Sequence, residues 1–202
     1  MVAAAPRQSI MVGDIRLTYL PDGETRLAPT AFFPASTEEG WKLHPEWLDG
    51  DGLLLQGKGS ALADCSPLTC GVGDRRYEVS VELEIEGDGH GGLAVFYDER
   101  GHAGLGFSRG ERLTYGYGQE QRWMREPGPG ARVHVRLRNI DNVLTFHQSS
   151  DGEHWVQHPW QMEVSGLHHN VFGGFLSRKG ALFSAGAGQV RFRDFRYRGL
   201  PG

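Results

Sequence analysis

Cysteine is scarce in this sequence, with only Cys65 and Cys70 among its 202 residues. Their spacing matches neither a zinc ribbon nor a CxxC redox motif, and a bridge between them would close a very small loop. The sequence therefore predicts two free thiols, and it argues against a fold that depends on disulfides or on a cysteine-bound metal.

Long apolar runs are also missing. No stretch approaches the roughly 20 apolar residues that a membrane-spanning helix needs. Residues 1–7 lack the basic start and the apolar core of a signal peptide. We therefore expect no membrane partner, and the cytoplasm is the expected location.

An excess of basic residues is absent as well. The formal net charge is -4 and the sequence pI is about 6.1, whereas general binders of nucleic acid or of anionic membranes carry a basic excess. No nucleic-acid partner is expected. The arginines are spread through strand-like segments, which is typical of solvated strand faces with cross-strand ion pairs.

Glycine and proline, in contrast, are plentiful, with 30 and 10 residues. Together with short runs of β-branched and aromatic residues, they favour an all-β protein with many turns. The chain length suits one well-buried domain and is too short for two large ones.

The clearest strand pattern lies in the second half of the chain. Val133, Val135 and Leu137 alternate with charged residues, so one face of this strand is apolar and the other is charged. Residues 139–142 supply a turn, because Asn and Asp bond to their own backbone and tolerate left-handed dihedrals. Residues 143–147 return as a second strand, which predicts an antiparallel hairpin.

Further strands are expected along the whole chain. They are predicted at residues 14–19, 77–85, 92–97, 103–107, 112–117, 173–177 and 189–197, and a tight turn at residues 50–52 leads into Leu53, Leu54 and Leu55. Near Asp194 the apolar positions change parity, which indicates a β-bulge. Strands without amphipathic helices between them leave a two-sheet antiparallel β-sandwich, with the apolar faces about 10 Å apart.

One long series of segments carries a resemblance to a known family. It comprises residues 56–59, 66–68, 77–84, 92–97, 104–107, 135–139, 150–155, 168–175 and 190–197. In this order, residues from about 53 to 200 resemble the concanavalin A-like β-sandwich at the C-terminus of family 43 glycoside hydrolases, the beta-xylosidase group. In that family the domain packs on a catalytic propeller and does not itself cleave. The resemblance implies a concanavalin A-like jelly roll over residues 51–202, with residues 1–50 as an N-terminal extension that packs on it.

The extension has a resemblance of its own. Residues 12–23, 34–36, 41 and 44–48 look like the start of bacterial metallo-beta-lactamase-fold hydrolases. The activity of that family needs a downstream HxHxDH motif, which this chain does not contain, so the metal site is not carried over. A short helix is expected at residues 35–41, with Ser36 as its cap and Glu39 three residues on.

Three functions are compatible with these observations. The first is a non-catalytic module that binds an oligosaccharide or polysaccharide, or docks onto a glycoside hydrolase partner. The second is a glycan hydrolase or lyase that uses the concave face, and the third is a structural module that forms homo-oligomers.

Aromatic side chains are the first candidates for a sugar site, because sugar rings stack on aromatic faces. Tyr97, Tyr115, Tyr117 and Trp123 lie on nearby predicted strands and could line one concave face. The alternative is that they are core or sheet-face aromatics.

Polar residues supply the remaining candidates. His168, His169 and Asn170 form either a polar contact to a sugar or a hydrogen-bonded loop pair that fixes a turn. Asp194 is the candidate ligand of a structural calcium, which the resemblance suggests near the termini, although calcium needs six to eight oxygens. No other cofactor is expected.

Carboxylates are numerous, and a glycoside hydrolase needs two of them on either side of one sugar. Glu82 and Glu84 share one strand face. We expect them to pair across strands with His134, Arg136 or Arg138, if the two strands are neighbours.

Overall fold

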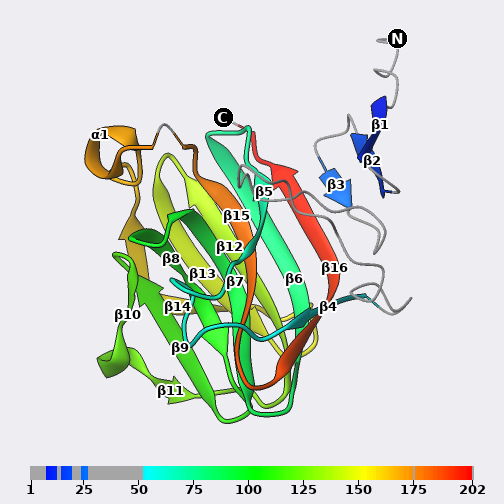
Figure 1. The fold of residues 1–202 in the computed structure, drawn as a ribbon, viewed down its shortest axis with the longest axis vertical. Coiled ribbons are helices and arrows are strands. Elements are labelled where there is room, and N and C mark those ends of the chain that lie inside the picture. Colours follow the sequence, from blue (N-terminus) through cyan, green and yellow to red (C-terminus); the bar gives the residue numbers. More distant parts are fainter. Residues whose placement is uncertain (1–7, 13–14, 20–23, 27–51, 175, 202) are drawn as a thin grey trace.

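The computed structural model describes residues 8–12, 15–19, 24–26, 52–174 and 176–201. Two antiparallel sheets pack face to face (Figure 1), as the sequence predicts for a concanavalin A-like β-sandwich. Among the described residues, no helix is long and apolar enough to cross a membrane.

The first sheet, here called the β7 sheet, has the order β10-β9-β8-β7-β15-β5, and β11 pairs with β9. Its strands are β5 (Leu68–Gly71), β7 (Gly89–Asp98), β8 (Gly101–Phe107), β9 (Glu111–Gly116), β10 (Gln119–Glu120), β11 (Glu126–Pro127) and β15 (Lys179–Gly186). The short 3-10 helix η2 (Arg122–Met124) links β10 to β11.

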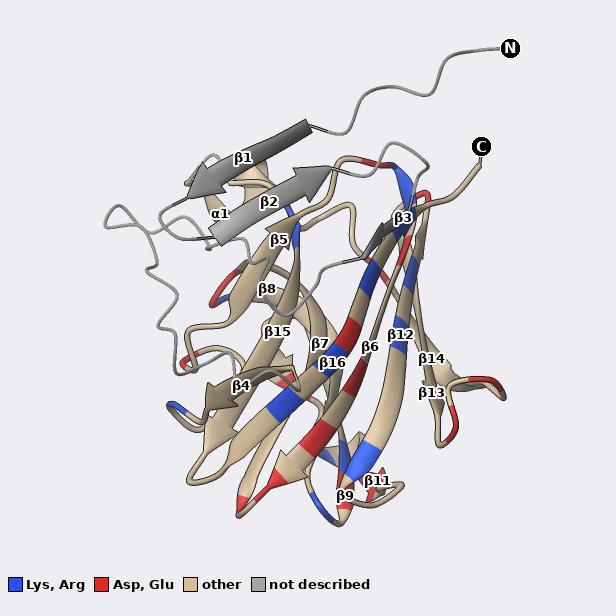
Figure 2. Cartoon of the chain, turned by 90° about the vertical axis from the view of Figure 1, so that its right-hand side faces the viewer, with Lys and Arg blue, Asp and Glu red and all other residues tan. Residues whose placement is uncertain are grey.

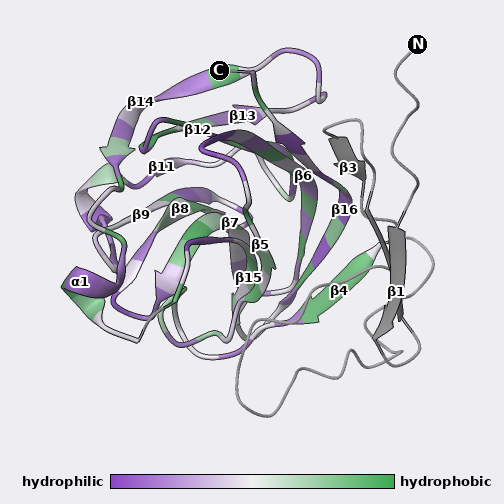
Figure 3. Cartoon of the chain, turned by 90° about the horizontal axis from the view of Figure 1, so that it is seen from above, coloured by the Kyte–Doolittle hydropathy of each residue, from purple (hydrophilic) through white to green (hydrophobic). Residues whose placement is uncertain are grey.

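The second sheet, here called the β6 sheet, has the order β14-β13-β12-β6-β16-β3, and β4 pairs with β16. Its strands are β3 (Glu24–Arg26), β4 (Leu53–Gln56), β6 (Arg76–Glu86), β12 (Arg132–Ile140), β13 (Val143–Ser149), β14 (Val156–Glu163) and β16 (Gln189–Gly199). Seen from above, β13, β12, β6 and β16 follow one another around the outside of β8, β7 and β15 (Figure 3).

The main core fills the space between the sheets. Tyr77, Val79, Val81, Leu83 and Ile85 of β6 are each at most 3% exposed and pack against the apolar side of the β7 sheet. The strand predicted at residues 77–85 is confirmed. Burial of each such side chain contributes about 1.5–3 kcal/mol, which is why period-two segments of this chain pair into a sandwich.

A second, smaller cluster covers the outer face of the β7 sheet. Leu62 and Cys65, from the loop before β5, close over it and are 0% and 3% exposed. The Asp64 carboxylate fixes this loop by accepting hydrogen bonds from the backbone N–H groups of Ser60 and Ala61, both at 2.8 Å. Both cysteines are free thiols, as predicted.

The predicted bulge near Asp194 is confirmed. The pairing of β16 with β6 shifts register between Arg193 and Arg196, and Asp194 adopts a left-handed φ of 50°. The extra residue explains how Phe192 and Phe195, which differ in parity, are both buried.

The strand predicted at residues 173–177 is wrong, because its described residues lie outside any strand. Gly173 and Gly174 have left-handed φ values of 78° and 77°, which a strand does not accommodate. They follow the short helix α1 (His169–Phe172), which the sequence did not indicate. The Tyr97 hydroxyl donates to the Gly173 carbonyl and accepts from the N–H of Leu176, so this loop is tied to the core.

Part of the predicted N-terminal extension joins the sandwich, since β3 pairs with β16. Strands β1 (Gln8–Val12) and β2 (Ile15–Tyr19) pair with each other, and β2 agrees with the strand predicted at 14–19. The helix expected at residues 35–41 lies outside the described residues.

Candidate functional site

The four aromatic residues proposed for a sugar face do not share one surface. Tyr97 and Tyr115 are 1% and 0% exposed, so they are core residues. Tyr117, in the turn between β9 and β10, and Trp123, in η2, are 69% and 78% exposed. Aromatic composition does not tell which face of a strand is covered.

Tyr115 belongs to a group of rings in the second cluster. Its ring centroid lies 5.4 Å from that of Phe183 and 6.2 Å from that of His102, which stacks on Phe96 at 5.8 Å. The Tyr115 hydroxyl and the Nε2 atom of His102 have no hydrogen-bond partner among the described residues.

Four buried or half-buried histidines are expected to make the fold sensitive to acid. Burial lowers the pKa of His90, His102, His147 and His158. An unfolded histidine takes up its proton near pH 6.5, so between about pH 6.5 and the lower folded values the unfolded chain binds more protons than the folded chain. We expect stability that is complete above about pH 6.5 and falls as the pH decreases, measured by thermal unfolding at about pH 8 and about pH 5.

The variant His102→Phe is the control for this pH dependence. It keeps a ring stacked on Phe96 and removes a titrating group whose Nε2 has no partner. The loss of melting temperature on acidification should become smaller than in the unmodified protein. An equal loss in both proteins, or no loss in either, would contradict the prediction.

His168, His169 and Asn170 lie at the start of α1. The Nδ1 atom of His168 accepts a hydrogen bond from the backbone N–H of Asn170 at 3.1 Å and so caps the helix. This is the loop pair considered as one alternative from the sequence. A contact of these residues with a sugar stays a prediction.

Asp194, proposed as a calcium ligand, forms an ion pair with Arg196 at 2.6 Å. Within the parts of the chain that the structure describes, no group of three or more His, Cys, Asp or Glu residues is arranged to hold a metal ion. The geometry around Asp194 therefore gives the calcium hypothesis no support.

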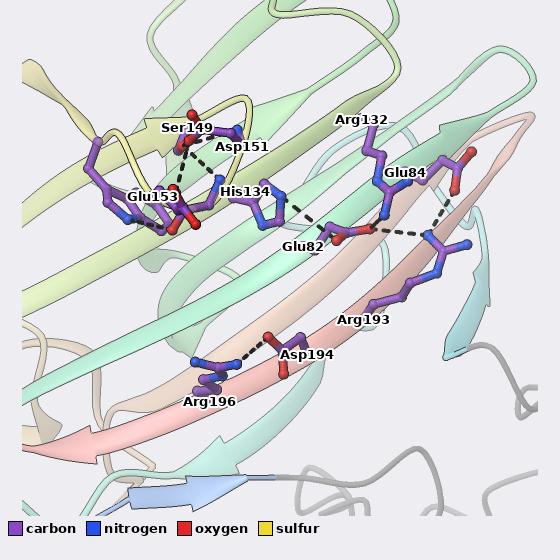
Figure 4. Close-up of polar contacts among 12 residues, drawn as sticks. Glu82, Glu84, Arg132, His134, Ser149, Asp151, Glu153, Arg193, Asp194 and Arg196 are labelled. Atoms are coloured by element: carbon purple, nitrogen blue, oxygen red, sulfur yellow. Dashed lines mark hydrogen bonds and ion pairs between the residues drawn. The ribbon is translucent and has the colours of Figure 1, made fainter.

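A groove of about 460 Å³ lies over the outer face of the β6 sheet. Its floor and walls come from β6, β12, β16 and the loop between β13 and β14, and Figure 4 shows several of its polar contacts. The lining comprises Glu78, Ser80, Val81, Glu82, His134, Arg136, Asp151, Gly152, Glu153, Trp155, Asp194, Arg196 and Arg198.

The floor of the groove is a charged ladder across three strands. Acidic β6 lies between β12 and β16, which carry the arginines (Figure 2). Glu82 pairs with Arg132 at 2.6 Å, with His134 at 3.8 Å and with Arg193 at 3.4 Å. The predicted pairing of Glu82 with His134 on a neighbouring strand is confirmed, and Glu84 pairs with Arg193 at 2.8 Å instead of with β12.

The arginines predicted as partners of Glu82 and Glu84 pair instead with Glu78. The Glu78 carboxylate lies 3.7 Å from Arg136, 3.2 Å from Arg138 and 2.9 Å from Arg198. The register explains the correction, because Arg138 is directly opposite Glu78 on β12, and Arg198 is opposite it on β16.

Ser80 is the gap in this ladder. It lies opposite Arg136 on β12 and opposite Arg196 on β16. Its side chain is short where its neighbours on the same face are glutamates, so there is room above it, between two arginines.

The loop between β13 and β14 forms a wall with a fixed shape. The Asp151 carboxylate accepts hydrogen bonds from the backbone N–H groups of Glu153 and His154 at 2.9 and 2.8 Å. These bonds hold the pKa of Asp151 far below its usual range, and the bond from the His154 backbone has the largest effect. The indole N–H of Trp155 donates to the Gly152 carbonyl at 3.0 Å.

The groove contains carboxylates and His134, the combination that a glycan-cleaving enzyme would need. A general acid, however, must keep its proton near neutral pH. The pKa of Asp151 is lowered, whereas a general acid needs a raised one. Glu78 and Glu82 form ion pairs with arginines.

Sequence reasoning did not single out Ser80 or Trp155 as parts of a site. The sequence contained one signal for the groove, since Ser80 is a small residue in a series of outward-facing positions that otherwise carry glutamates (78, 82 and 84). This signal indicates a site only when β12 and β16, which carry the arginines, are known to be the neighbours of β6.

The comparisons with known proteins agree with the fold. A family model described as the beta xylosidase C-terminal Concanavalin A-like domain matches residues 26–198. Among curated proteins, none matches the chain. The resemblance of the extension to metallo-beta-lactamase-fold hydrolases stays a prediction.

Solved structures show the same architecture at low sequence identity. The GH43 BlXynB protein from Bacillus licheniformis is 14% identical with a TM-score of 0.64, and the match covers 74% of this chain and 33% of that chain. The xylan beta-1,4-xylosidase from Bacillus halodurans C-125 is 17% identical with a TM-score of 0.65, and the match covers 77% of this chain and 35% of that chain. A functionally unknown protein from Saccharomyces cerevisiae is 15% identical with a TM-score of 0.53, and the match covers 89% of this chain and 98% of that one.

The chain therefore spans about a third of the length of the two Bacillus proteins. The family model matches well over half of the chain, and the predicted resemblance is confirmed and extends to residue 26. The chain belongs to the family of beta-xylosidase C-terminal concanavalin A-like domains.

Proposed function

We propose that this domain is a carbohydrate-binding module that takes a short saccharide into the groove over Ser80. The observation that carries the proposal is the groove itself, a hollow of about 460 Å³ whose lining is mostly charged. Its volume falls in the range of about 300–1,000 Å³ that is usual for small-molecule sites.

The chemistry of the lining suits sugar hydroxyls. Carboxylates accept and guanidinium groups donate hydrogen bonds, and a sugar hydroxyl does both. The ladder of ion pairs across β12, β6 and β16 holds these groups in place before a ligand arrives, which lowers the entropy lost on binding. The names of the matched proteins point to xylan-derived sugars as the first ligands to test.

Calorimetric titration with xylo- and arabino-oligosaccharides tests the proposal. The variant Ser80→Tyr, which places a ring in the gap between Arg136 and Arg196, should weaken binding at least about tenfold, the equivalent of about 1.4 kcal/mol. Trp123→Ala and Tyr117→Ala are the controls, because these exposed residues do not line the groove.

The outcomes separate the possible sites. Loss of binding in Ser80→Tyr alone supports the groove. Loss in Trp123→Ala or Tyr117→Ala alone would move the sugar to the surface near β10 and η2 and overturn the groove. An absence of binding to every oligosaccharide would remove the carbohydrate-binding function.

A second candidate function is docking onto a glycoside hydrolase domain. The match covers only 33% and 35% of the two Bacillus proteins, so in those proteins a matching domain is joined to a larger part of the same chain. This favours a partner of that kind for the present domain. The exposed Tyr117 and Trp123 offer an apolar contact. Sedimentation of the chain with a family 43 hydrolase domain that lacks its own sandwich tests this, and Trp123→Ala should weaken any complex.

A further inference from the structure

The charges in the groove are not evenly balanced. At its Glu78 end, one carboxylate faces three guanidinium groups, those of Arg136, Arg138 and Arg198, at 3.7, 3.2 and 2.9 Å. One negative charge against three positive charges leaves an excess of two positive charges there. The nearby His147 has a pKa that is lowered by burial first and then by Arg136 and Arg138, which fits a positive local potential.

At the other end of the groove, the ladder has as many carboxylates as guanidinium groups. Glu82 and Glu84 together face Arg132 and Arg193, at 2.6–3.4 Å. Asp194 also pairs with Arg196. An anionic group on a ligand would therefore be favoured at the Glu78 end.

The acidic wall lies over the other end of the groove, because a Cβ at Gly152 would lie 3.2 Å from the ring of His134, which is opposite Glu82 on β6. The carboxylate of Asp151 is turned toward the backbone N–H groups of its own loop and toward the imidazole of His154, 2.7 Å away. It has partners of its own, and the Glu153 side chain that follows it is exposed to solvent.

Arg136 is the guanidinium that is best prepared to receive an anion. Its guanidinium carbon lies 3.8 Å from the centroid of the Trp155 ring, so the indole holds it in a fixed plane. Its side chain is 26% exposed and lines the groove, so the guanidinium can be reached by a ligand. Guanidinium groups bind carboxylates through paired N–H donors, and Ser80, directly opposite, leaves room for such a group.

We propose that the groove selects saccharides that carry a carboxylate, the uronic acids, and that Arg136 binds this carboxylate together with Arg198. Trp155 acts as a positioning residue that orients Arg136. This inference rests on the proposed carbohydrate-binding function and names the class of sugar that the groove prefers.

A matched pair of ligands tests the inference. One is a xylo-oligosaccharide that carries a single glucuronic acid, and the other is the same oligosaccharide without it. The acidic ligand should bind about tenfold more tightly. The preference should shrink as sodium chloride is added, because salt screens the excess positive charge.

Arg136→Gln should remove the preference for the acidic ligand, so that the ratio of the two affinities falls from about ten to about one. Trp155→Leu should reduce the preference only in part, because Arg136 stays but loses its fixed plane. The control is Arg191→Gln, which removes the same charge from the same sheet face. Arg191 pairs with Glu86 at 3.0 Å, and neither residue lines the groove.

Each result decides between the claims. Equal affinity for the two ligands overturns the inference and leaves carbohydrate binding in place, whereas no affinity for either removes both. Inorganic phosphate and free glucuronate serve as further probes. Binding of phosphate as tight as that of the acidic oligosaccharide would make the groove a simple anion site and overturn selection of a uronic acid. A loss of preference in Arg191→Gln equal to that in Arg136→Gln would show a general effect of net charge and overturn the role of Arg136.

Discussion

Replacing Gly92 by alanine is expected to destabilise the sandwich by about 3 kcal/mol. Gly92 lies on β7, in the middle of its sheet, between Gly106 on β8 and Phe183 on β15. A Cβ atom at this position would collide with the carbonyl oxygen of Leu105 and lie 2.8 Å from the Cα of Gly106. These are backbone atoms of a paired strand, so the clash cannot be relieved by rotating a side chain.

Urea unfolding monitored by tryptophan fluorescence measures the effect. Gly110→Ala is the matched control, because a Cβ there meets nothing within 4 Å and Gly110 lies in the turn of the same sheet, between β8 and β9. We expect a clear fall in the urea midpoint for Gly92→Ala and almost none for Gly110→Ala. Equal midpoints for the two variants would show that β7 and β8 can separate without penalty, contrary to the geometry.

The fold was largely predictable, because a buried face imposes a period of two on each strand. In β6 and β12 the alternation of apolar and charged residues identified both the strands and their inward faces. β7 carries large residues on both faces, which fits its position in the middle of the sheet. The prediction failed at Gly173 and Gly174, where composition resembles a strand but left-handed backbone angles form a loop.

The site was much less predictable, since it depends on which strands become neighbours. The sequence placed Tyr115 on a strand, but only the tertiary structure shows that Leu62 covers the same face. Similarly, Ser80 is one outward residue among several until β6 is seen between β12 and β16. Contacts between residues this far apart in the chain have no signature in local periodicity, whereas buried faces do.

The substitution Glu78→Gln is expected to destabilise the protein by about 2–4 kcal/mol. Glu78 is 8% exposed, and its carboxylate is the shared partner of Arg136, Arg138 and Arg198. Glutamine has nearly the same shape but no charge, so three guanidinium groups on adjacent strands would remain close together without a counter-ion. Glu153→Gln is the control, because it removes an exposed carboxylate from the rim of the same groove.

Salt and ligand binding show whether repulsion is the cause. Added sodium chloride should narrow the stability difference between Glu78→Gln and the unmodified protein, because it screens the repulsion among the arginines. If the groove selects uronic acids, the same variant should bind the acidic oligosaccharide more tightly, since the carboxylate that competes for Arg136 and Arg198 is gone. A packing defect would lower both stability and affinity and would not respond to salt. Opposite changes in stability and in affinity are therefore expected only if Glu78 acts as the internal counter-ion of the groove.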